Sequence, residues 1–104
     1  MDKVFKALAD PTRRELLDRL RAEGGQTLNG LCERLAMSRQ AVSKHLLQLE
    51  EANLVATQKR GREKLHYLNP VPIQEIADRW IGNYERGRLE ALSQLKKSLE
   101  REAS

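Results

Sequence analysis

The sequence predicts a mainly helical domain in which four helices are followed by one β-hairpin and a final long helix. Apolar residues recur at helical spacing before residue 52 and again after residue 72, whereas apolar and polar residues alternate between 54 and 68. The length of 104 residues suits one compact core. We therefore expect a single domain over 1–104.

The first two helices are separated by an Asp-Pro pair. Asp10 is a suitable helix cap, and Pro11 is tolerated at a first helical position, so a second helix is expected to begin there. Two consecutive glycines, Gly24 and Gly25, end it. The apolar residues of the preceding short helix share one face, namely Val4, Phe5 and Leu8.

A helix-turn-helix is predicted over 28–52. Thr27 and Ser38 are suitable caps for its two helices, and Asn53 suits a left-handed exit from the second. Cys32 occupies the position at which a small residue lets the two helices approach closely. The inward positions are apolar: Leu31, Leu35, Met37 and Val42.

The second of these helices has a polar face suited to DNA. Arg39 and Gln40 lie in its first turn and can form the paired hydrogen bonds that distinguish guanine or adenine. Ser43 can bond a base or a phosphate, and Lys44 a phosphate or guanine. At the helix starts, Thr27 and Ser38 can present backbone N–H groups to phosphates.

A hairpin is expected over 54–68, with a glycine supplying its turn. Its basic tip can follow a DNA backbone or enter a minor groove. The alternative interpretation of these basic residues is a solvated turn that does not contact DNA. The basic residues are Lys59, Arg60, Arg62 and Lys64. Residues 39–64 hold six basic and three acidic side chains, which is most of the net charge of +4. This local excess favours a polyanionic partner.

The last helix, expected over 70–99, is too long for so small a domain. From Ile73 to Leu99 it would span ~40 Å, so part of its apolar stripe is expected to meet a second copy of the chain. Gly82 and Gly87 weaken its middle and permit a bend or a close approach of helices. The expected dimer interface comprises Val4, Phe5, Leu8, Ile73, Ile76, Ala77, Trp80, Tyr84, Leu92 and Leu95. A pocket for an apolar effector at Trp80 and Tyr84 is the weaker alternative.

Several functional classes are disfavoured. The sequence has no glycine-rich phosphate loop, paired-carboxylate motif or zinc signature, so neither an enzyme nor a bound cofactor or metal is expected. No apolar run approaches the ~18 residues of a membrane span, and the N-terminus is too polar for a signal peptide. With a single cysteine, the chain is expected to be cytoplasmic.

The chain resembles the ArsR/SmtB family of winged helix-turn-helix repressors. The segments that carry this resemblance are 8–13 (LADPTR), 38–46 (SRQAVSKHL), 52–55 (ANLV), and the wing residues 60–62 and 67–68. The resemblance implies a dimer built from the first and last helices, with paired recognition helices in successive major grooves of an inverted repeat. It also implies repression that a signal relieves.

The resemblance does not extend to the metal ligands of many family members. The Cys-x-Cys pair is absent, and the last helix has no histidine. We therefore expect no metal sensing at either familiar site, and the effector remains unnamed. Cys32 is interpreted as a buried packing residue rather than a redox switch, and His45 as a structural histidine rather than a DNA contact. The rival function is a protein-interaction module that has lost DNA binding.

Overall fold

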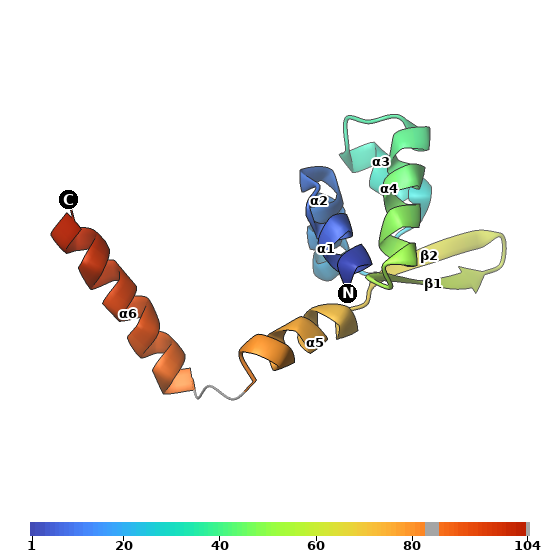
Figure 1. The fold of residues 1–104 in the computed structure, drawn as a ribbon. Helices are drawn as coiled ribbons and strands as arrows, with labels where there is room; N and C mark the ends of the chain where they lie inside the picture. Colours follow the sequence, from blue (N-terminus) through green and yellow to red (C-terminus); the bar gives the residue numbers. More distant parts are fainter. Residues whose placement is uncertain (83–85, 104) are drawn as a thin grey trace. The chain divides into compact units, whose positions relative to one another are not determined.

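The computed structural model describes residues 1–82 and 86–103 and has the winged helix-turn-helix architecture. The chain divides into two compact units, Met1–Gln74 and Glu75–Ser104. The first unit contains α1 (Asp2–Leu8), α2 (Pro11–Ala22), α3 (Leu28–Arg34), α4 (Arg39–Glu51), β1 (Val55–Arg60) and β2 (Glu63–Leu68). Beyond it follow most of α5 (Val71–Trp80) and α6 (Arg86–Ala103) (Figure 1).

Side-chain caps fix the starts of three helices in the first unit. Asp10 accepts a hydrogen bond from the backbone N–H of Arg13, and Thr27 and Ser38 cap α3 and α4 in the same way. Each cap satisfies an N–H group that the helix itself cannot pair. The predicted starts of these helices are confirmed.

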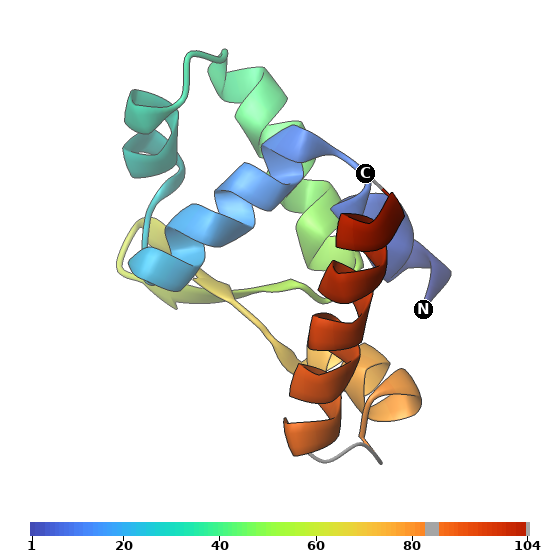
Figure 2. The same cartoon turned by 90° about the vertical axis from the view of Figure 1, so that its left-hand side faces the viewer.

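The core of the first unit lies where α1 and α2 pack on α4, and where α3 meets α4 and β2 (Figure 2). Burial of each large apolar side chain contributes roughly 1.5–3 kcal/mol to stability. The fully buried side chains are Leu16, Leu31, Val42, Leu49 and Leu54.

α4 ends in a Schellman motif that directs the chain into the hairpin. Asn53 has a φ of 62°, the N–H of Leu54 donates to the Leu49 carbonyl, and the N–H of Asn53 donates to that of Glu50. The left-handed exit predicted at Asn53 is confirmed. The buried Leu54 then anchors the start of the hairpin in the core.

The hairpin is antiparallel, and its strands pair from Val55 with Leu68 to Arg60 with Glu63. Gly61 has a φ of 64° at the first central position of the two-residue turn, as type II′ turns require. The loop between α2 and α3 joins this sheet through a bridge between Gln26 and His66. That bridge, which was not predicted, attaches the wing to the helices.

The single helix expected over 70–99 is wrong, because the structure has two helices there. α5 ends at Trp80, residues 81–82 form a turn, and α6 begins at Arg86. A glycine lowers helix stability by ~1 kcal/mol relative to alanine, and Gly82 lies where the helix stops. None of the helices in 1–82 and 86–103 is long and apolar enough to cross a membrane.

Candidate nucleic-acid interface

α4 has a buried apolar face and an exposed face that is mostly polar. Val42, Leu46 and Leu49 are buried against the other helices. The predicted DNA-reading side chains all lie on exposed positions: Arg39, Gln40, Ser43 and Lys44. The helical register thus provides the outward polar surface that base recognition needs, and contact with DNA stays a prediction.

One of these side chains is held by a neighbouring helix. Nη1 of Arg39 donates a hydrogen bond to Oδ1 of Asn29, an exposed residue in the first turn of α3. Asn29 was not predicted as a site residue, although the helix-turn-helix register places the starts of the two helices near each other. No periodic pattern identifies an exposed polar pair of this kind.

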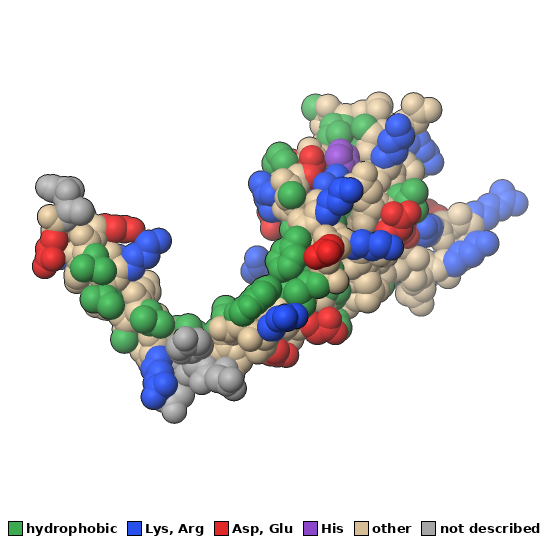
Figure 3. Space-filling model, viewed as in Figure 1, with side chains coloured by type: hydrophobic (Ala, Val, Ile, Leu, Met, Phe, Trp, Pro, Cys, Tyr) green, Lys and Arg blue, Asp and Glu red, His purple; other side chains and the backbone are tan. Residues whose placement is uncertain are grey.

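The tip of the hairpin carries exposed positive charge. Lys59, Arg60 and Arg62 are exposed and have no ion-pair partner within the described ranges. Figure 3 shows Lys and Arg side chains gathered at this end of the hairpin. Lys64 differs, because its Nζ lies 2.8 Å from Oε1 of Glu50 on α4. This ion pair links the wing to the recognition helix.

An open groove of about 420 Å³ lies between α4 and the hairpin. Arg39, Ser43 and Glu50 line it from α4, and Arg62 and Lys64 line it from the wing. The groove therefore brings together residues that the sequence assigned separately to base reading and to backbone binding.

The side chains of Thr27 and Ser38 act as helix caps, and contact of either residue with a phosphate stays a prediction. The hydroxyl oxygens of Thr27 and Ser38 accept hydrogen bonds from the N–H groups of Gly30 and Ala41. Each hydroxyl keeps its proton for donation to a phosphate oxygen. Thr27 is half-buried, whereas Ser38 is exposed at the start of α4.

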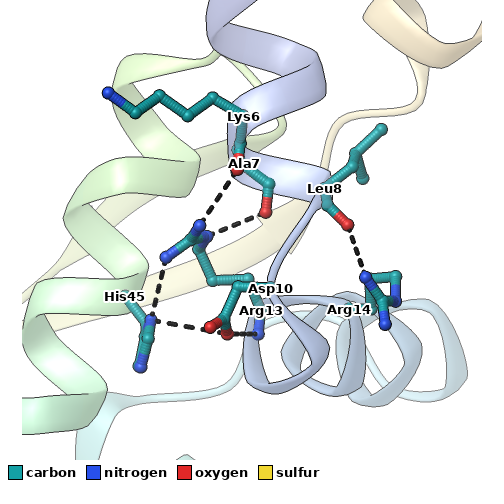
Figure 4. A network of polar contacts seen from close by, with 7 residues as sticks. All are labelled: Lys6, Ala7, Leu8, Asp10, Arg13, Arg14 and His45. Carbon is teal, nitrogen blue, oxygen red and sulfur yellow. Dashed lines mark hydrogen bonds and ion pairs between the residues drawn. The ribbon is translucent and has the colours of Figure 1, made fainter.

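A polar cluster connects α1, α2 and α4 (Figure 4). Nε of the buried Arg13 donates to the carbonyl oxygen of Ala7 at 2.8 Å, and Nη2 donates to that of Lys6 at 3.0 Å. Nη1 lies 3.3 Å from Nδ1 of His45, which is also 3.9 Å from Oδ2 of Asp10. His45 is therefore held within this cluster, as expected of a structural histidine, and the absence of a DNA contact stays a prediction.

The pKa of Asp10 is held below its ordinary value. The largest cause is the hydrogen bond from the backbone N–H of Arg13, and the Arg13 guanidinium adds to it. Desolvation acts in the opposite direction and is outweighed. The ionised carboxylate is therefore the form that suits the start of α2.

The residues expected in a dimer interface differ in exposure. Val4 is 8% exposed and already packs within its own chain, because it faces the core side of α1. The others fall into two groups: Phe5, Ile73, Trp80, Leu92 and Leu95 are exposed, and Leu8, Ile76 and Ala77 are half-buried. Tyr84 lies outside the described residues.

Cys32 is half-buried rather than buried as expected, because its neighbour Leu31 takes the fully buried position on α3. No three His, Cys, Asp or Glu side chains within 1–82 and 86–103 are grouped so that they could hold a metal ion.

Comparison with known proteins gives consistent matches. Residues 8–58 match a family model described as a helix-turn-helix domain. The chain is 38% identical over 86 residues to the uncharacterized HTH-type transcriptional regulator YuzN of Bacillus subtilis, covering 77% of this chain and 94% of that protein. It is 33% identical over 84 residues to the transcriptional repressor SdpR of the same organism, covering 81% of this chain and 91% of SdpR.

Among solved structures, an ArsR-like transcriptional regulator from Rhodococcus sp. RHA1 superposes with a TM-score of 0.72 at 36% sequence identity. The match covers 93% of this chain and 90% of that protein. These relatives are described as transcriptional regulators and not as enzymes.

Proposed function

Because the chain belongs to the ArsR/SmtB family of winged helix-turn-helix transcriptional regulators, we propose that it represses transcription as a homodimer bound to an inverted-repeat operator. Proteins of this family bind DNA to regulate transcription, and this chain is such a regulator. In the proposed mechanism, two recognition helices enter successive major grooves about one duplex turn apart and block an overlapping promoter.

The exposed polar face of α4 carries this proposal. Arg39 and Gln40 read base edges from the first turn of the helix, because both side chains can make paired hydrogen bonds to a purine. Ser43 and Lys44 add contacts one turn further along. At the starts of α3 and α4, Thr27 and Ser38 present backbone N–H groups to phosphates, which sets the register of the helix on the duplex.

The wing supplies affinity that does not depend on sequence. Lys59, Arg60 and Arg62 neutralise phosphates or enter the minor groove beside the recognition helix. Lys64 contributes less, since Glu50 already offsets its charge. Each phosphate contact releases counterions, so binding is expected to weaken steeply as the salt concentration rises.

Dimerisation is supported by apolar side chains exposed on the last two helices. α6 carries a stripe of Leu89, Leu92, Leu95 and Leu99 at helical spacing, and all four are exposed. On α5, Ile73 and Trp80 are exposed as well. Figure 3 shows hydrophobic side chains along both helices. In our proposal a second copy of the chain covers this surface, because contiguous apolar stripes mark interaction sites.

The proposal is tested by selecting bound duplexes from a random DNA pool and titrating the enriched sequence at two salt concentrations. We expect an inverted repeat whose affinity falls steeply with added salt. Absence of enrichment, together with absence of binding at low salt, would contradict the proposal and favour a protein-interaction module.

A further inference from the structure

We propose that Asn29 is a specificity-positioning residue, which holds the Arg39 guanidinium in the orientation that reads a base edge. This inference rests on the proposed function of α4. It concerns a residue of α3 that need not touch DNA. The observation that carries it is the hydrogen bond from Nη1 of Arg39 to Oδ1 of Asn29.

The two partners differ in flexibility. Arg39 is exposed on the first residue of α4, and a long arginine side chain there samples many rotamers when nothing holds it. Asn29 has a short side chain on the first turn of α3, whose N-terminus is fixed by the Thr27 cap. The hydrogen bond therefore restrains the Arg39 guanidinium to one orientation relative to α3.

The hydrogen bond to Asn29 leaves free the N–H donors of Arg39 that are needed to read a base. A guanidinium has five N–H donors, and Asn29 takes one of them on Nη1. The edge formed by Nε and Nη2 remains available for N7 and O6 of a guanine. Asn29 thus orients the group without competing for that edge.

The neighbouring polar side chains lack such a restraint. Gln40 and Lys44 are exposed, and neither has a side-chain hydrogen bond or ion pair in the described part of the chain. Because Asn29 orders the Arg39 side chain before DNA binds, the base preference should increase at the base pair that Arg39 reads. The preference at other base pairs of the operator should not change. Ordering one rotamer-rich side chain on binding weakens affinity by about two- to twelve-fold.

The experiment measures competition between the selected operator and duplexes with single base-pair changes. Arg39→Ala first identifies the base pair that Arg39 reads. We expect Asn29→Ala to reduce the preference at that base pair by about two- to twelve-fold and to leave the other positions and random DNA unchanged. In the Arg39→Ala background, Asn29→Ala should have no further effect.

Two further variants separate positioning from a general structural effect. Asn29→Asp keeps the acceptor and adds a negative charge, so it should retain the base preference while weakening binding to all DNA. Gln48→Ala removes another exposed amide, on the part of α4 that faces a groove with Lys3 and Lys6 of α1, and should change neither property.

NMR relaxation of the arginine side chains tests the restraint without DNA. Nε of Arg39 should be more ordered than Nε of Arg60 or Arg62 in the free wild-type protein, and this difference should disappear in Asn29→Ala.

Three results would overturn the inference: equal order of these arginines, an unchanged base preference in Asn29→Ala, or an effect of Asn29→Ala that persists without Arg39. A wild-type protein with no base preference would overturn the proposed function as well, so the two failures are distinguishable.

Discussion

Replacement of Arg13 by alanine should destabilise the protein far more than the same change at the adjacent Arg14. The Arg13 guanidinium is bonded to the carbonyl oxygens of Ala7 and Lys6 in the last turn of α1, and it contacts His45 of α4 (Figure 4). Arg14 is exposed and makes one comparable bond, from Nη1 to the Leu8 carbonyl oxygen at 2.8 Å. The two positions therefore differ both in burial and in the number of bonds that the guanidinium makes.

The magnitude follows from what each change leaves behind. Arg13→Ala leaves the buried Ala7 carbonyl without this partner, which costs about 1–3 kcal/mol, and it removes the further bonds to Lys6 and His45. We expect a total loss of about 2–4 kcal/mol in the free energy of unfolding. Water can replace the exposed bond of Arg14, so Arg14→Ala should change stability by less than about 0.5 kcal/mol.

Urea denaturation followed by far-UV circular dichroism measures both values. The variants must be compared at one protein concentration, because unfolding of a dimer depends on concentration. A loss for Arg13→Ala that equals the loss for Arg14→Ala would refute the argument that burial makes this cluster important.

The cap at Asp10, the wing and α5 each carry one further prediction. Because the folded pKa of Asp10 lies below its ordinary value of 3.8, its ionised form stabilises the fold above that pH, and this stabilisation is lost as the pH falls through the folded pKa. The difference in unfolding free energy between wild type and Asp10→Asn should therefore shrink below about pH 4 in urea titrations, and a difference that does not change with pH would contradict this. Arg62→Ala should weaken operator and random DNA alike and reduce the slope of log K against log salt by about 1, whereas a loss confined to the operator would argue against a phosphate contact. Trp80→Glu places a charge at a side chain that is 55% exposed and should shift the mass from dimer to monomer in sedimentation equilibrium, while Gln94→Glu on the polar side of α6 should not. An unchanged dimer in Trp80→Glu would exclude this part of α5 from the interface.

Local chemistry explains which parts of the fold could be predicted from the sequence. The caps at Asp10, Thr27 and Ser38 and the left-handed Asn53 each satisfy backbone groups a few residues away, so a short segment is sufficient to identify them. The arc of exposed residues on α4 was predictable for the same reason, because helical period alone separates it from the buried face.

Pairings between distant segments could not be predicted in this way. The bridge between Gln26 and His66 joins residues 40 positions apart, and Gln26 has the appearance of an ordinary loop residue. The ion pair of Glu50 with Lys64 and the bond of Asn29 with Arg39 join polar side chains, which no hydrophobic pattern reveals.

The break after α5 shows a different limit. Apolar residues continue at helical spacing across Gly82, so the periodic signal alone favours one helix. The cost of glycine in a helix is similar in size to the stabilisation that a few exposed helical residues provide, so the pattern could not decide the outcome.

DNA binding by α4 and the wing is tested best by locating the DNA-binding face on the protein itself. Backbone and arginine side-chain NMR signals of the ¹⁵N-labelled protein can be followed as the selected operator duplex is added. We predict that the largest changes fall in residues 38–44 and 59–62. Perturbation of another surface, with both of these segments unchanged on the bound protein, would contradict it.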